Sequence, residues 1–177
     1  MIHGRILYKN KYVVLLLIGL LPVLWGCSYR FSGTGTLPSG MTRIYVSMIE
    51  NKTAETGIEN YLTDNLINEF ILRKKEVLSR QEDAEGILSG SIEYIRVASV
   101  AHSSQSISSQ RRVFIGAMLK LVDTNGKTVW AVNGINASEV YKVTDDKTLT
   151  EQNKKAAMQV LSKRLAEKIY NRLTDDF

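Results

Sequence analysis

The sequence predicts an α+β fold, a two-layer sandwich in which two helices cover one face of a four-stranded, largely antiparallel sheet. Two segments repeat apolar residues every four positions, which is the stripe of an amphipathic helix. Four other segments are rich in β-branched and aromatic residues, as strands are. Because each kind of segment has one apolar face, helices and sheet bury each other only as two layers. The predicted order is β-α-β-β-β-α.

The first strand is expected at 43–49, followed by a loop at 50–57 and a helix at 57–74. Glu59 near the start of this helix and Arg73 at its end suit the helix dipole. The stripe that predicts the helix consists of Ile58, Leu62, Leu66 and Phe70. Such a stripe indicates a core-facing helix rather than a binding groove.

Three strands are expected between Ala84 and Tyr141. In the first, the apolar positions alternate up to Tyr94 and then change face, which indicates a bulge near 94–95. The second, 110–123, alternates cleanly, and Asn125-Gly126 favours a tight primed turn into the third. The apolar positions of the second strand are Val113, Ile115, Ala117, Leu119 and Leu121. The segment 99–109 contains six serines and is expected to form a long polar hairpin tip.

The last segment is expected to be a helix over about 149–174, starting with a capping box formed by Thr148 and Glu151. Its outer face is basic, with Lys154, Lys155, Lys163, Arg164, Lys168 and Arg172 against Glu151 and Glu167. This pattern is typical of a solvated helix face, and it also fits contact with an anionic membrane surface.

The N-terminus has the layout of a bacterial export signal. Arg5, Lys9 and Lys11 precede an apolar run at 13–24. Twelve residues reach only about 18 Å in a helix, well short of a bilayer core of ~30 Å. A buried core helix is the alternative, but the run lacks the polar face that such a helix carries.

The run ends in Leu24-Trp25-Gly26-Cys27, which resembles the lipobox of bacterial lipoproteins. The resemblance implies cleavage after Gly26 and attachment of lipid to Cys27, the only cysteine of the chain. The resemblance to such lipoproteins also implies that Ser28, a residue other than Asp after the cysteine, favours sorting to the outer membrane, with the protein facing the periplasm. The expected organisation is a signal peptide at 1–26, an acylated tether at 27–42 and a single α+β domain at 43–177.

Composition argues against several function classes. Of the net charge of +5, residues 1–26 supply +3, so the rest of the chain is close to neutral and does not suit a nucleic-acid binder. One cysteine excludes a zinc site built on several thiolates. No catalytic motif occurs, and His102 is the only histidine after the signal. We therefore expect no enzyme activity, no cofactor and no metal.

A series of short motifs along the whole mature chain resembles the lipopolysaccharide-assembly lipoprotein family LptE. Each motif is weak alone, but their order and spacing together are fairly specific. They are Cys27-Ser-Tyr-Arg-Phe31, Leu37-Pro-Ser-Gly40, Glu50-Asn51-x-Thr53, Gly57-Ile-Glu-x-x-Leu-Thr63, Glu69-Phe70, Ala84-x-Gly-Ile-Leu-x-Gly90, Arg111-Arg112-Val113, Asp123-x-x-Gly126-x-x-x-Trp130, Arg164-Leu-Ala-Glu167 and Arg172-Leu-Thr174.

The resemblance implies a non-enzymatic protein that plugs the LptD β-barrel, assists its assembly and contacts lipopolysaccharide on the way to the cell surface. Because lipopolysaccharide is anionic, its phosphates would be bound by Arg or Lys. The candidates are Arg96, Arg111, Arg112 and Lys120, which are equally well explained as ordinary strand charges. The alternative function is a structural or pilot lipoprotein of another envelope secretion complex.

Overall fold

The computed structural model describes residues 37–100 and 110–175, all of which fall in one compact unit, Gly35–Phe177. The predicted signal peptide, Gly26, Cys27, the tether up to residue 36 and most of the 99–109 tip lie outside the described residues.

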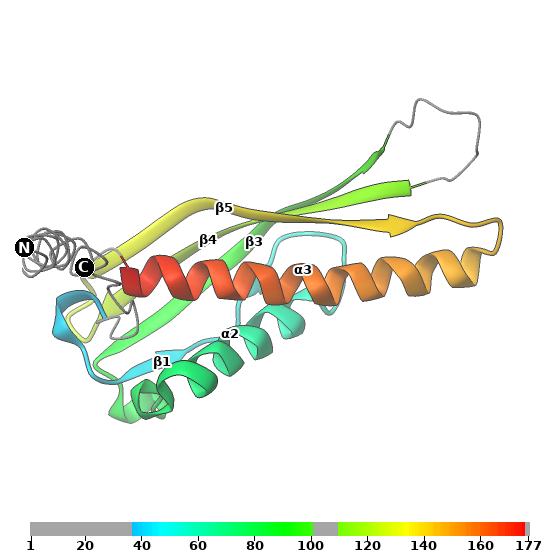
Figure 1. The fold of residues 1–177 in the computed structure, drawn as a ribbon. Helices are drawn as coiled ribbons and strands as arrows, with labels where there is room; N and C mark the ends of the chain where they lie inside the picture. Colours follow the sequence, from blue (N-terminus) through cyan, green and yellow to red (C-terminus); the bar gives the residue numbers. More distant parts are fainter. Residues whose placement is uncertain (1–36, 101–109, 176–177) are drawn as a thin grey trace, which may run out of the picture. The chain divides into compact units, whose positions relative to one another are not determined.

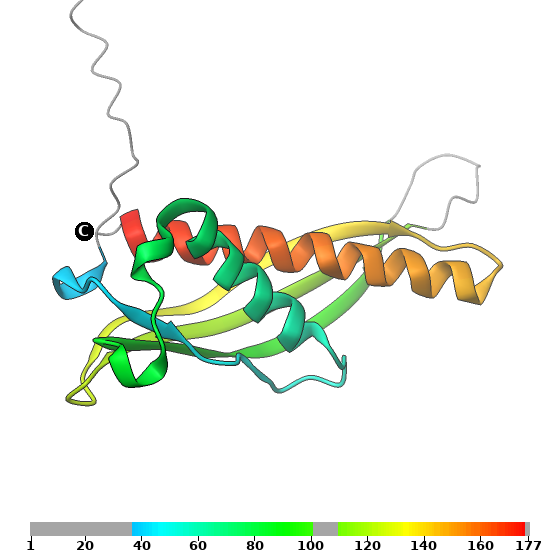
Figure 2. The same cartoon turned by 90° about the horizontal axis from the view of Figure 1, so that it is seen from below.

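The described residues form two α-helices, three short 3-10 helices and one mixed sheet of five strands, which confirms the predicted α+β class and adds one strand to the four predicted. The strands are β1 (Ile44–Val46), β2 (Glu50–Asn51), β3 (Gly86–Ser99), β4 (Gln110–Asp123) and β5 (Thr128–Lys142). The sheet order is β1-β3-β4-β5, with β2 also paired to β3. The long β3, β4 and β5 are antiparallel, whereas β1 and β2 run parallel to β3. Helices α2 (Ile58–Lys74) and α3 (Lys147–Asp175) pack on one face of the sheet (Figures 1 and 2).

The short strand β2 lies where the sequence predicted a loop. Glu50 and Asn51 pair with Ser91 and Ile92 of β3, so the chain adds a second parallel stretch after β1. Two residues are too few for a periodic pattern, and their polar side chains are typical of loops. The pairing comes from the position of the neighbouring strand rather than from local propensity.

The predicted stripe of α2 is buried. Ile58, Leu62, Leu66 and Phe70 are all 0–1% exposed, as is expected of side chains that each contribute about 1.5–3 kcal/mol when fully buried. The Phe70 ring meets the Tyr170 ring of α3 edge to face, with 5.0 Å between the centroids. The two helices therefore pack against each other as well as against the sheet.

The predicted capping box of α3 is wrong. The helix begins at Lys147, and the Asp146 carboxylate accepts hydrogen bonds from the amides of Thr148 at 2.8 Å and Leu149 at 3.2 Å. Asp146 precedes the first helical residue, so its carboxylate reaches the free amides of the first turn, which the Thr148 hydroxyl was expected to serve.

The turn between β4 and β5 also differs from its prediction. Gly126 has a φ of 81°, but Asn125 has no positive φ, so the turn is not a primed one. The Gly126 amide donates to the Asp123 carbonyl at 3.0 Å. The Asp123 carboxylate also accepts from the amides of Asn125 and Lys127, each at 2.9 Å. These bonds favour a type I turn closed by a left-handed glycine.

Three side chains of α3 bind backbone carbonyls along the outer edge of β5. Asn153 donates to Lys142 at 3.1 Å, Arg164 to Ser138 at 2.7 Å, and Lys168 to Asn136 at 2.9 Å. The basic face of this helix is therefore only partly solvated, because two of its cations hold the helix against the edge strand.

Candidate functional site

The two faces of β4 have different surroundings. Its odd-numbered residues from Val113 to Leu121 point toward the helices and are 0–2% exposed. Its even-numbered residues point away from them. We call this second side of the sheet, with the cross-strand partners of those even-numbered residues, the open face.

Three cations gather on the open face near the end of β4 that follows the serine-rich segment. Arg96 lies opposite Phe114, two residues from Arg112, so Arg96 and Arg112 are diagonal neighbours whose backbones are about 7–8 Å apart. Lys142 lies opposite Gln110 and is the diagonal neighbour of Arg112 on its other side. We call Arg96, Arg112 and Lys142 the cationic row.

Arg96 is held in place by an aromatic stack. The guanidinium carbon of Arg96 lies 4.2 Å from the centroid of the Tyr94 ring, in cation–π geometry. Tyr94 lies over Gly116 so closely that a Cβ on residue 116 would fall 2.2 Å from a ring carbon. The missing side chain of Gly116 thus makes room for Tyr94, which in turn supports Arg96.

Tyr94 lies on the open face because the bulge of β3 comes before Tyr94 in the chain, earlier than the sequence predicted. The register shifts between Ile92 and Tyr94, so the extra residue is Glu93 and not a residue at 94–95. Ile92 lies opposite Ala117 on the helix side, whereas Tyr94 lies opposite Gly116 on the open face. The prediction that Tyr94 continues the apolar face of Ile92 is therefore wrong.

No carboxylate among the described open-face residues of β4, and of β5 from Asn136 to Lys142, neutralises the cationic row. Glu139 points to the other face, where it pairs with Arg164 at 2.7 Å. Glu93 is occupied by the Ser91 hydroxyl and by Lys52, with 2.9 Å between the Lys52 Nζ and the carboxylate. These two partners, Ser91 first, lower the pKa of Glu93.

The four predicted lipopolysaccharide-binding residues do not form one site. Arg96 and Arg112 lie together, but Arg111 is opposite Tyr141 on the helix side of the sheet. Lys120 is on the open face, eight residues along β4 from Arg112, or about 26 Å. Sequence reasoning missed Lys142, although its place on the open face follows from alternation with Tyr141, which is buried.

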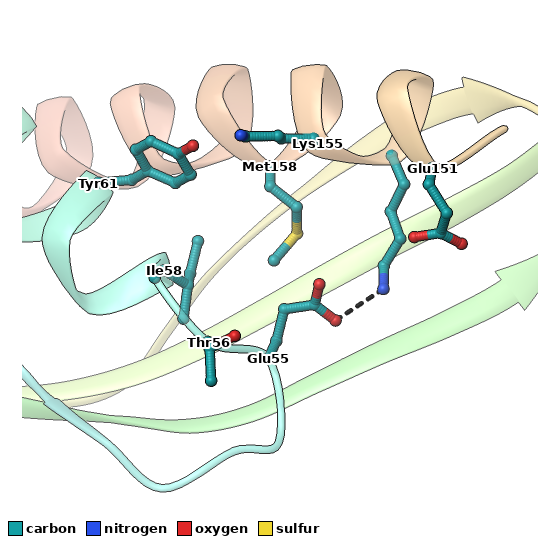
Figure 3. A pocket seen from close by; sticks show the side chains of 9 residues that line it. Glu55, Thr56, Ile58, Tyr61, Glu151, Lys155 and Met158 are labelled. Carbon is teal, nitrogen blue, oxygen red and sulfur yellow. Dashed lines mark hydrogen bonds and ion pairs between the residues drawn. The ribbon is translucent and has the colours of Figure 1, made fainter. Parts of the chain in front are cut away.

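A cavity of about 420 Å³ lies between the loop before α2 and the first turns of α3 (Figure 3). Lys154 pairs there with Glu55 at 2.7 Å, and this hydrogen bond raises the pKa of Lys154. Glu151 and Lys155 also line the cavity. With two carboxylates beside two lysines, this cavity is poorly suited to an anion.

Within the described ranges 37–100 and 110–175, no group of three or more His, Cys, Asp or Glu side chains is arranged to hold a metal. Among the helices of those same ranges, none combines the length and the apolar character needed to cross a membrane.

Comparison with protein families identifies the family of this chain. Residues 41–173 match the family model described as LptE: Lipopolysaccharide-assembly, which covers more than half of the chain. A comparison with curated protein sequences found no match.

Solved lipoprotein structures share the fold. A minor lipoprotein from Acinetobacter baumannii is 12% identical and aligns over 76% of this chain and 92% of its own, with a TM-score of 0.52. The rare lipoprotein B from Shewanella oneidensis is 9% identical and aligns over 74% of this chain and 94% of its own, with a TM-score of 0.51. An uncharacterized lipoprotein B from Nitrosomonas europaea is 14% identical and aligns over 84% of this chain and 90% of its own, with a TM-score of 0.50.

Proposed function

Because the chain belongs to the lipopolysaccharide-assembly family LptE, we propose that it is a non-enzymatic outer-membrane lipoprotein that occupies the LptD β-barrel and helps it assemble. In this role it contacts lipopolysaccharide during delivery to the cell surface. Lipid on Cys27 anchors it, after cleavage behind Gly26. The family match over residues 41–173 is the observation that carries the proposal.

The cationic row is the part of the described chain best suited to lipopolysaccharide. Arg96 and Arg112 are diagonal neighbours on the open face, and guanidinium groups bind phosphate through two parallel hydrogen bonds. Tyr94 holds Arg96 in a fixed orientation at 4.2 Å, which lowers the entropy cost of binding. Lys142 adds a third charge on the same face.

Two double variants separate this site from the other candidates. Arg96→Ala/Arg112→Ala removes two cations of the row, and Arg111→Ala/Lys120→Ala removes the same charge from two other places. Each lost charge-assisted hydrogen bond is worth about 1.5–3 kcal/mol, so we expect the Kd for purified lipopolysaccharide to rise about tenfold or more in the first variant only. An equal loss in both variants, or a loss in the second alone, would contradict the assignment.

The partnership with LptD is tested by affinity purification of the lipidated chain from envelope extracts. We expect the barrel to be recovered with it, and mass spectrometry to find acyl chains on Cys27. Recovery of a different outer-membrane pore without LptD would instead support the alternative role in a secretion complex. An unmodified N-terminus would remove the proposed anchor.

A further inference from the structure

A cavity of about 470 Å³ lies between a bulge in β5 and the second half of α3. We call it the bulge cavity. Its polar lining comes from Asn133, Gly134 and Asn136 of β5 and from Lys168, Asn171 and Arg172 of α3. It is separate from the cationic row, because none of these residues belongs to that row.

The bulge cavity is shaped by one extra residue in β5. Ala117 pairs with Ile135 and Leu119 with Val132, so Met118 faces two residues, Asn133 and Gly134. Gly134 has a φ of 71°, and no atom lies within 4 Å of the position a Cβ would take there. The Asn136 side-chain amide donates to the Gly134 carbonyl at 3.1 Å. Bulges of this kind redirect side chains next to binding sites.

The lining provides donors and positive charge but no carboxylate. Lys168 donates to the neutral Asn136 carbonyl at 2.9 Å, so its charge is not cancelled. The Asn171 Oδ1 accepts from Arg73 at 3.1 Å, which leaves the NH₂ group of Asn171 as a donor. Arg73 itself is paired with Glu69 at 2.9 Å.

Other cavities of similar size differ in this respect. The cavity of Figure 3 contains Glu55 and Glu151, and the open-face cavity around Lys120 contains Glu50. A carboxylate in the lining repels an anion, whereas paired Lys and Arg with amide donors match the oxygens of a phosphate.

We propose that the bulge cavity binds a phosphate group, held by Lys168 and Arg172 and oriented by the amides of Asn133 and Asn171. The ligand is either a phosphate group on a glycan or free inorganic phosphate, since both present the same oxygens. The site does not depend on the function proposed above.

The test is an NMR titration of the mature lipoprotein in detergent micelles, with inorganic phosphate and with deacylated lipopolysaccharide as separate probes. We expect the amide signal of Gly134 and the side-chain NH₂ signals of Asn133 and Asn171 to shift together with one Kd. Tighter binding of the deacylated lipopolysaccharide identifies the glycan as the source, and tighter binding of inorganic phosphate identifies the free ion. No saturable shift with either probe overturns the proposal.

Matched variants on the same helix control for charge. In Lys168→Gln/Arg172→Gln we expect the Kd to rise at least tenfold, while Lys155→Gln/Lys163→Gln, with the same charge change, leaves it within twofold. Glutamine at 168 keeps an NH₂ donor for the Asn136 carbonyl and removes only the charge. An equal rise of the Kd in both double variants would show that phosphate is attracted by the overall positive charge of the helix, and it would overturn the proposed site.

The outcome is separable from the fate of the proposed function. Arg96→Ala/Arg112→Ala should leave the shift at Gly134 unchanged. If no variant affects capture of intact lipopolysaccharide but Lys168→Gln/Arg172→Gln abolishes the phosphate response, the bulge cavity stands and the cationic row does not.

Discussion

Arg111 and Arg112 are neighbours in the chain, yet they lie on opposite faces of the sheet. On the helix side, the odd-numbered residues of β4 from Val113 to Leu121 are apolar and almost completely buried, whereas Arg111 at the start of the strand is exposed. On the open face, the same strand carries Arg112 and Lys120, and midway between them Gly116 makes room for the ring of Tyr94. One strand therefore serves both purposes, with its odd positions contributing stability and its even positions available to a ligand.

The largest expected effect comes from truncating the helix side. Ile115 is 0% exposed, so Ile115→Ala removes buried methyl groups and leaves a cavity, at a cost of about 2–5 kcal/mol in the free energy of unfolding. Arg112→Ala, on the open face, should change it by about 0.5 kcal/mol or less. Urea unfolding of both variants measures the difference. Similar losses in the two would show that the faces are not divided in this way.

A smaller effect is expected where the open face is itself tightly packed. Gly116→Ala forces the Tyr94 ring away, because the new Cβ would lie 2.2 Å from it, and we expect a loss of about 1–3 kcal/mol. In a Tyr94→Ala background the same substitution should cost less than half as much, since the ring is gone. The double-mutant cycle by urea unfolding measures this coupling. Additive losses would mean that Tyr94 does not rest on Gly116.

The smallest expected effect is on the stability at acidic pH, through Glu93 at the bulge of β3. The pKa of Glu93 is lowered from an ordinary value of 4.5 by the Ser91 hydroxyl and Lys52. A lowered pKa adds stability that is present above that ordinary value and is lost as the pH falls through the folded-state pKa. Glu93→Gln should therefore flatten the acid side of the stability profile slightly, whereas Glu76→Gln, at an exposed position, should not. Indistinguishable profiles for the two variants would contradict this role of Glu93.

Regular periodicity made most of the fold predictable. The stripes of α2 and α3 and the alternation of β4 recur over many turns or residues, so each pattern predicted its element and its buried face. In α3 the stripe consists of Ala157, Leu161, Leu165, Ile169 and Leu173, which are 0–5% exposed. The missed features are local. The N-cap by Asp146, the turn closed by Gly126 and the two-residue pairing of β2 each depend on where one side chain or one neighbouring strand lies in space.

The candidate site was predicted only in part. Alternation already placed Val113 on the buried face, and it therefore placed Arg111 on that face and Arg112 on the other. Grouping the two by their adjacency overlooked this. Lys142 and the stack of Arg96 on Tyr94 depend on strand register and on the bulge at Glu93, which the sequence located one or two residues too late.

The contacts from α3 to β5 affect the tendency of the protein to self-associate. A strand at the margin of a sheet normally exposes carbonyls that recruit further strands, and long margins promote aggregation. Here Asn153, Arg164 and Lys168 occupy the carbonyls of Lys142, Ser138 and Asn136. Two cations of the basic helix face, Arg164 and Lys168, thus cover the exposed edge of β5. This protects the edge against pairing with strands of other molecules.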